Sequence, residues 1–78
     1  MTYRPRLRRR EVPQYLAERY GIEITLSTLN TYACRGGGPI MQYAGRIPLY
    51  RLEDLDSWAE TRLSPPVGMT SERQLYHG

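Results

Sequence analysis

The residues of this chain that are best suited to chemistry are its arginines, and the chemistry that they suit is the binding of anions. All eleven basic residues are arginine, since the chain has no lysine. A guanidinium is planar and always charged, and it pairs with a phosphate or a guanine edge through two parallel hydrogen bonds. Five of these residues crowd the start of the chain: Arg4, Arg6, Arg8, Arg9 and Arg10. This cluster predicts contact with a polyanion.

The acidic residues leave the centre of the sequence free. Between Glu23 and Glu53 there is no aspartate or glutamate, and the stretch carries Arg35, Arg46 and Arg51. A polyanion can approach such a segment without meeting a carboxylate. A net charge of +3 can also reflect solubility alone, but this distribution of charge favours nucleic acid as the partner.

Residue combinations typical of enzymes are missing from the sequence. Cys34 is the single cysteine, so no intramolecular disulfide can form, and the single histidine, His77, stands near the end of the chain. The glycine run at 36–38 lacks the Gly-Lys-Ser/Thr ending of a phosphate-binding loop. We therefore expect no catalytic residue, no cofactor and no metal site.

The size of the chain limits the fold to one small domain. It has 78 residues, and its hydrophobic fraction of 40% favours a globular structure. No apolar run approaches the roughly 20 residues that cross a bilayer, and no apolar segment follows the basic start as it would in a secretory signal. We expect a cytoplasmic protein that does not associate with membranes.

Residues 1–10 are predicted to form a basic arm, since Pro5 and the repulsion between arginines disfavour regular structure there. A first helix is predicted over 11–20, with Pro13 in its first turn and Gly21 as its C-terminal cap. Its apolar residues recur at helical spacing: Val12, Leu16 and Tyr20.

A second helix is predicted from the cap residue Thr25 to about Arg35, where the glycine run and Pro39 end it. Its inner face is apolar and consists of Leu26, Leu29, Tyr32 and Ala33. Its outer face is small, polar and uncharged, and consists of Ser27, Asn30, Thr31 and Cys34.

Two short strands and a third helix complete the predicted domain. The strands are expected at 40–43 and 47–51, joined by the turn Ala44-Gly45-Arg46, and Pro48 marks the second as an edge strand. The helix is expected at 52–63, and residues 64–78 are expected to form a flexible tail. The core face of this third helix consists of Leu52, Leu55, Trp58 and Ala59. Its acidic residues are expected to form a solvated face that points away from DNA, and they are Glu53, Asp54, Asp56 and Glu60.

The order of several short motifs resembles a known family. Thr28-Leu29, Gly36 with Pro39, Gly45-Arg46, Tyr50-Arg51 and Asp54-Leu55 with Trp58 are similar to the winged helix-turn-helix domains of MerR-type regulators and of the excisionase and AlpA group of phage-like regulators. With the Arg-Arg-Arg-Glu-Val opening and the short tail, the chain looks most like the RdfS-type recombination directionality factors of integrative and conjugative elements. The long dimerising helix and effector domain of MerR regulators have no counterpart in this sequence.

This resemblance implies a fold that is mostly α with a small β-hairpin, in which residues 11–63 form a winged helix-turn-helix. It implies a DNA-binding excisionase that binds and bends attachment-site DNA and biases a tyrosine integrase toward excision. Two other functions stay open, a small transcriptional regulator of a mobile element and a winged-helix module that docks a partner protein. Steep weakening of DNA binding by salt would separate the first two from the third.

Nine residues are predicted to contact double-stranded DNA. The second helix would enter the major groove, where Asn30 pairs with an adenine edge and Ser27 and Thr31 reach bases or phosphates. Arg35 would hold the backbone, and Arg46 would insert into the minor groove or bridge phosphates. Four arm residues would hold phosphates or a narrow minor groove: Arg4, Arg6, Arg8 and Arg9.

The predicted tail raises a question of assembly. It carries the apolar or aromatic residues Val67, Met69, Leu75 and Tyr76. One hypothesis is that the tail docks on a neighbouring copy, so that copies load head to tail and cooperatively along DNA. The other is that the tail has no such role.

Overall fold

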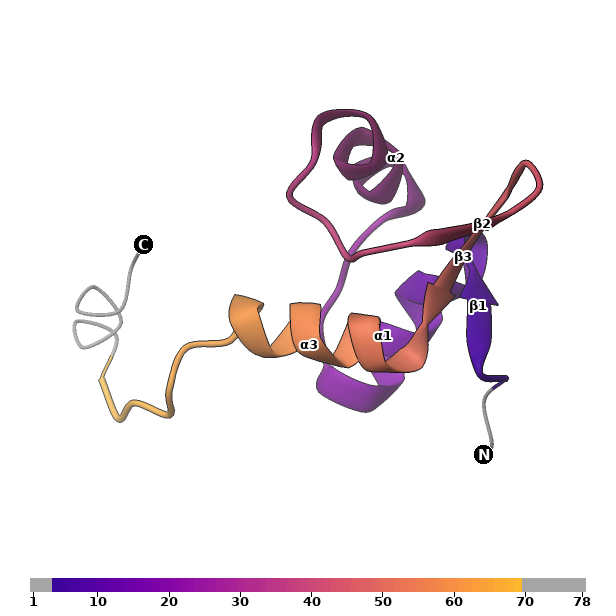
Figure 1. The fold of residues 1–78 in the computed structure, drawn as a ribbon. Coiled ribbons are helices and arrows are strands. Elements are labelled where there is room, and N and C mark those ends of the chain that lie inside the picture. The colour runs from indigo at the N-terminus through magenta and orange to yellow at the C-terminus, as the bar shows by residue number, and fades with distance from the viewer. Residues whose placement is uncertain (1–3, 70–78) are drawn as a thin grey trace.

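One small sheet and three α-helices make up the part of the chain that the structure, a computed structural model, describes, residues 4–69 (Figure 1). The sheet is antiparallel and has three strands in the order β1-β3-β2. The elements follow one another as β1 (Arg6–Arg8), the 3-10 helix η1 (Arg9–Glu11), α1 (Val12–Tyr20), α2 (Leu26–Arg35), β2 (Gln42–Ala44), β3 (Ile47–Arg51) and α3 (Leu52–Arg62). The described part of the chain is therefore mixed α/β, whereas the sequence predicted a mostly α fold with a two-stranded hairpin; the additional strand is β1.

The strand β1 corrects the prediction of an irregular arm over residues 1–10. Arg6–Arg8 pair antiparallel with β3, and Leu7 lies opposite Tyr50. Both side chains are buried, with 2% and 1% of their surface exposed. Since neighbouring residues of a strand point to opposite faces, burial of Leu7 leaves the arginines on either side of it exposed. The gain from that burial and from the strand pairing outweighs the repulsion between the arginines.

The position of Pro48 corrects a second prediction, because β3 is the central strand and not an edge strand. Ala44 lies opposite Ile47 across the two-residue turn, and Tyr43 lies opposite Pro48. In an antiparallel ladder this second pair is a non-hydrogen-bonded one, so the nitrogen of Pro48 points away from β2. Pairing with β1 begins only at Leu49. The missing N–H of the proline therefore costs no hydrogen bond within the sheet.

The three predicted helices are confirmed, and their ends differ from the prediction by single residues. The first begins at Val12 with Pro13 in its first turn, and Gly21 caps it in the left-handed region at a φ of 68°. In α2 the hydroxyl of Thr25 accepts a hydrogen bond from the Thr28 N–H at 3.1 Å, as expected of an N-cap. The third ends at Arg62.

The core contains side chains from the sheet and from all three α-helices. Its fully buried members are Leu7, Val12, Tyr15, Leu16, Leu29, Tyr50, Leu55 and Ala59. Helix α2 contributes only Leu29 to this set, and Leu26, which was predicted on the inner face of α2, is 43% exposed. Helix α2 therefore rests on the rest of the domain through a narrow contact.

The acidic face of α3 is only partly solvated, which corrects another prediction. The Tyr15 hydroxyl donates a hydrogen bond to Asp56 Oδ1 at 2.6 Å. Burial raises the pKa of Tyr15, and the hydrogen bond to Asp56 raises it further. Arg51 makes two hydrogen bonds to Asp54, at 2.7 and 3.0 Å. These carboxylates therefore hold α3 to α1 and β3.

None of the helices in residues 4–69 combines the length and the apolar character that crossing a membrane requires.

Candidate nucleic-acid interface

The outer face of α2 is exposed as predicted. Ser27, Asn30, Thr31 and Cys34 all lie at the surface, and Arg35 ends the helix with its side chain exposed. The Thr31 hydroxyl donates a hydrogen bond to the carbonyl of Ser27 at 3.2 Å. Its proton is therefore engaged within the helix, and Thr31 offers a ligand mainly an acceptor oxygen and a methyl group.

The turn of the β2–β3 hairpin presents Arg46. Gly45 precedes it at a φ of 67°, a left-handed conformation that a glycine adopts without strain. The Arg46 side chain is exposed, and within residues 4–69 it has neither a hydrogen bond nor an ion pair. Tyr43, on the neighbouring strand, is 62% exposed. The hairpin therefore offers one unpaired cation and one aromatic ring.

These two elements form what we call the α2–hairpin surface, composed of Ser27, Asn30, Thr31, Cys34, Arg35, Tyr43 and Arg46. In Figure 1 α2 and the hairpin turn lie in the upper part of the molecule, and α1 and α3 lie below them. No acidic residue occurs between Glu23 and Glu53, so this surface carries no carboxylate. The next acidic residues along the chain are carried by α3, which lies below α2 and the hairpin turn in this view.

Arg9 is placed differently from the prediction. It was expected to hold a phosphate, but its guanidinium folds back against the domain and is partly buried. Its Nε donates to the Tyr50 hydroxyl at 3.0 Å, one terminal nitrogen to Asn30 Oδ1 at 3.2 Å, and the other to the Met41 sulfur at 3.5 Å. The hydrogen bond to Tyr50 is the main reason that the pKa of Arg9 is raised. Arg9 therefore joins α2 to the hairpin.

Two other arginines of the predicted arm project from the opposite face of the sheet. Because Leu7 and Tyr50 face the core, Arg6 and Arg8 face outward on the other side. The Nε of Arg6 donates to Gln42 Oε1 at 3.0 Å across the sheet. The structure therefore does not bring this pair together with the outer residues of α2.

Arg4 is engaged by Glu11. The two side chains form an ion pair, and Glu11 Oε1 also accepts a hydrogen bond from the Arg8 backbone N–H at 2.7 Å. That backbone hydrogen bond is the main cause of a lowered pKa for Glu11, and Arg4 lowers it further. Part of the positive charge of Arg4 is therefore neutralised within the fold.

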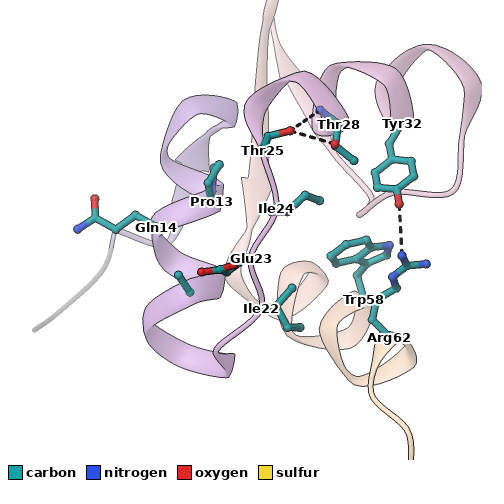
Figure 2. A pocket seen from close by; sticks show the side chains of 11 residues that line it. Pro13, Gln14, Ile22, Glu23, Ile24, Thr25, Thr28, Tyr32, Trp58 and Arg62 are labelled. Carbon is teal, nitrogen blue, oxygen red and sulfur yellow. Dashed lines mark hydrogen bonds between the residues drawn. The ribbon is translucent and has the colours of Figure 1, made fainter. Parts of the chain in front are cut away.

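A groove lies apart from the α2–hairpin surface (Figure 2). Its walls come from α1, the connection at 21–25, the inner side of α2 and α3. At its end Tyr32 and Trp58 meet edge to face, with their ring centroids 6.0 Å apart. The Trp58 N–H donates to the carbonyl of Gly37 at 3.0 Å, and Arg62 lies 5.3 Å above the Trp58 ring. Both aromatic rings are only partly buried, although each was predicted on an inner, core-facing helix face. They fasten the end of α2 to α3.

The glycine run that ends α2 packs against the same aromatic pair. A Cβ at Gly38 would lie 2.6 Å from the Cβ of Tyr32, which is closer than two non-bonded carbon atoms approach each other in proteins. Gly38 therefore allows this close approach, in addition to the role in ending the helix that the sequence predicted.

No family model matches the chain, and no curated protein matches it.

Several residues at this site were not predicted from the sequence. Met41 and Tyr50 hold Arg9, and Gln42 holds Arg6, yet none of the three was a candidate. The alternation of Arg6, Leu7 and Arg8 is the signal that could have revealed β1 and, with it, these contacts.

Of the predicted tail, Val67 and Met69 are 37% and 63% exposed, and Leu75 and Tyr76 lie outside the described residues.

Proposed function

We propose that this protein binds double-stranded DNA through the α2–hairpin surface, as a winged helix-turn-helix in which the hairpin is the wing. The observation that carries the proposal is the separation of charge. Arg35 and Arg46 stand exposed on a surface without carboxylates, whereas the acidic residues of α3 lie on the other side of the fold. A polyanion is attracted to the first side and repelled by the second.

Each part of the surface has a role in this proposal. Helix α2 enters the major groove, where small polar side chains allow a close approach to the base edges. Arg35 pairs with a phosphate at the end of the helix, and Arg46 reaches the minor groove or the phosphates beside it. Arg6 and Arg8, on the other face of the sheet, serve at most a flanking backbone. Arg9 is withdrawn from the set of phosphate ligands, since it is bonded within the fold.

The biological role that fits best is that of an excisionase. Such a protein does no chemistry, binds attachment-site DNA in several copies, bends it and so favours excision by a tyrosine integrase. A domain of this size contacts few base pairs, so a single copy discriminates weakly between sequences and several copies are needed. A small regulator of a mobile element uses the same surface, and loss of element excision on deletion of the gene separates the two roles.

The test of DNA binding is a titration of a labelled duplex at several salt concentrations. We expect the logarithm of the association constant to fall linearly with the logarithm of the salt concentration, by about 0.9 for each phosphate contact. The double variant R35A/R46A should bind more weakly with a shallower slope. The control R62A, which changes the last residue of α3, should bind like the original chain. Absence of binding, or binding that salt leaves unchanged, contradicts the proposal and favours a protein-docking role.

A further inference from the structure

Arg9 and Asn30 meet between the two elements proposed to contact DNA. Asn30 is exposed on the outer face of α2, yet its Oδ1 accepts a hydrogen bond from Arg9 at 3.2 Å. The same guanidinium is fixed by the Tyr50 hydroxyl and the Met41 sulfur. A long and flexible side chain is thus held at three points, and it holds Asn30 in turn.

The chemistry of this contact sets the orientation of the Asn30 amide. A guanidinium has five N–H donors and no acceptor, so the amide atom that faces it must be the oxygen. The amide nitrogen therefore points away from Arg9 and directs two N–H donors to the other side. Recognition of adenine by asparagine needs both amide groups, since the oxygen accepts from N6 while the nitrogen donates to N7. An oxygen committed to Arg9 is poorly placed for that pairing.

We infer that Arg9 is a positioning residue that presents the amide N–H groups of Asn30 to the DNA, so that Asn30 selects guanine, whose O6 and N7 are both acceptors, rather than adenine. This inference rests on the proposed DNA-binding function. It replaces the sequence-based prediction of an asparagine–adenine pair. It also gives Arg9 a second effect, since one side chain fixes α2 relative to the hairpin strands.

The experiment is a selection of bound duplexes from a random DNA library, carried out with the original chain and with the variants N30A, R9M and R10M. The original chain should enrich guanine at one position by roughly tenfold over adenine, the scale of one good base contact. N30A should lose the preference at that position alone. R9M should lower it to within about twofold, because the released amide can turn and accept from adenine. R10M, the matched control for an exposed neighbouring arginine, should keep the preference.

Salt dependence separates positioning from simple charge. R9M should keep the salt slope of the original chain, since the proposal has Arg9 contact no phosphate. A variant that removes a phosphate contact, such as R46A, should reduce the slope. R9K serves as a second variant should R9M fold poorly. A lysine keeps the charge, but its three N–H donors share one nitrogen, whereas three separate nitrogens of Arg9 make the contacts to Tyr50, Asn30 and Met41. R9K should therefore relax the base preference as R9M does.

Three results would overturn the inference. One is a preference for adenine at the position that N30A affects. Another is an equal loss of affinity on all sequences in R9M together with a shallower salt slope, which would make Arg9 a phosphate ligand. The third needs no DNA: a double-mutant cycle of unfolding free energies for R9M and N30A that shows no coupling would mean that the pair does not interact. If the original chain binds no duplex, the proposed function fails and base selection fails with it, while the cycle still reports on the contact itself.

Discussion

The two sides of this small domain differ in whether their charged and polar groups are bonded to one another within the fold. On the side of α1 and α3 the groups are engaged with each other: Tyr15 with Asp56, Arg51 with Asp54, and Arg62 with the Tyr32–Trp58 pair. On the side of α2 and the hairpin, Arg35 and Arg46 have no hydrogen bond or ion pair among the described residues. The first side holds the fold together, and the second leaves its charges open to a ligand.

The comparison separates the arginines that are bonded within the fold from those left free to meet a ligand, a distinction that their number in the sequence does not make. Arg4 and Arg9 belong to the sequence cluster that suggested a polyanion, and both are bonded within the fold. Arg46 stands alone in the sequence and is the better candidate for DNA contact. Salt bridges and hydrogen bonds inside the fold reduce what a side chain can offer outside it.

The largest expected effect comes from breaking the link between β1 and the core. L7A should lower the free energy of unfolding by about 2–5 kcal/mol, because Leu7 is almost fully buried opposite Tyr50. The control L26A removes an exposed leucine of α2 and should cost much less. Urea denaturation followed by circular dichroism measures both. Equal and small losses would mean that β1 is not packed as described.

The next effect concerns the hairpin turn. R46A should weaken DNA binding by about 1–3 kcal/mol, the scale of one good contact, and should leave the thermal midpoint unchanged because Arg46 has no partner in the described fold. R62A should lower the thermal midpoint and leave DNA binding unchanged, since Arg62 lies over the Trp58 ring and donates a hydrogen bond to the Tyr32 hydroxyl. Normal DNA binding by R46A would remove the hairpin from the interface.

A smaller effect is expected at the start of α2. T25A should destabilise the protein by about 1 kcal/mol, since the Thr25 hydroxyl caps the helix at the Thr28 N–H. The loss should appear as faster amide exchange in α2 rather than in α1, because α2 buries only Leu29. S27A, an exposed neighbour, should leave exchange unchanged. Uniform acceleration in all helices would show that α2 does not open independently.

The smallest effect concerns acid. The pKa of Glu11 is lowered from its ordinary value of 4.5, so Glu11 stabilises the fold above that pH and the contribution is lost as the pH falls through the lowered value. E11Q should therefore flatten the loss of stability that the original chain shows as the pH falls below the ordinary glutamate value of 4.5. E60Q, which changes an exposed glutamate of α3, should leave it as it is. Thermal melts at several pH values decide between these outcomes.

The sequence predicted those elements whose signals are local. Thr25 as a cap, Gly21 as a C-terminal stop and Gly45 in a turn are determined by neighbours in the chain, and all three were found as expected. The strand β1 was missed because its partner, Tyr50, lies far along the chain and a three-residue strand has almost no pattern of its own. The contacts of Arg9 within the fold were not predicted for the same reason, since all three of its partners are remote in sequence.

These corrections also change how the arm can be tested. Deletion of residues 1–8 would remove Leu7 and the pairing with β3, so a loss of DNA binding would report unfolding as much as lost charge. Single substitutions of Arg6 and Arg8 keep the strand and remove only the charges that face outward. Their effect on binding should be smaller than that of R46A.

The most direct test of the central claim is to map the DNA contact on the protein by two-dimensional NMR, with a duplex titrated into the labelled full chain. The α2–hairpin surface should give the largest changes in amide chemical shift, at 27–35 and 43–47, and the exposed residues of α3 should change little. Changes centred on α3 or on the groove beside Trp58, with little effect at α2 and the hairpin, would contradict the account.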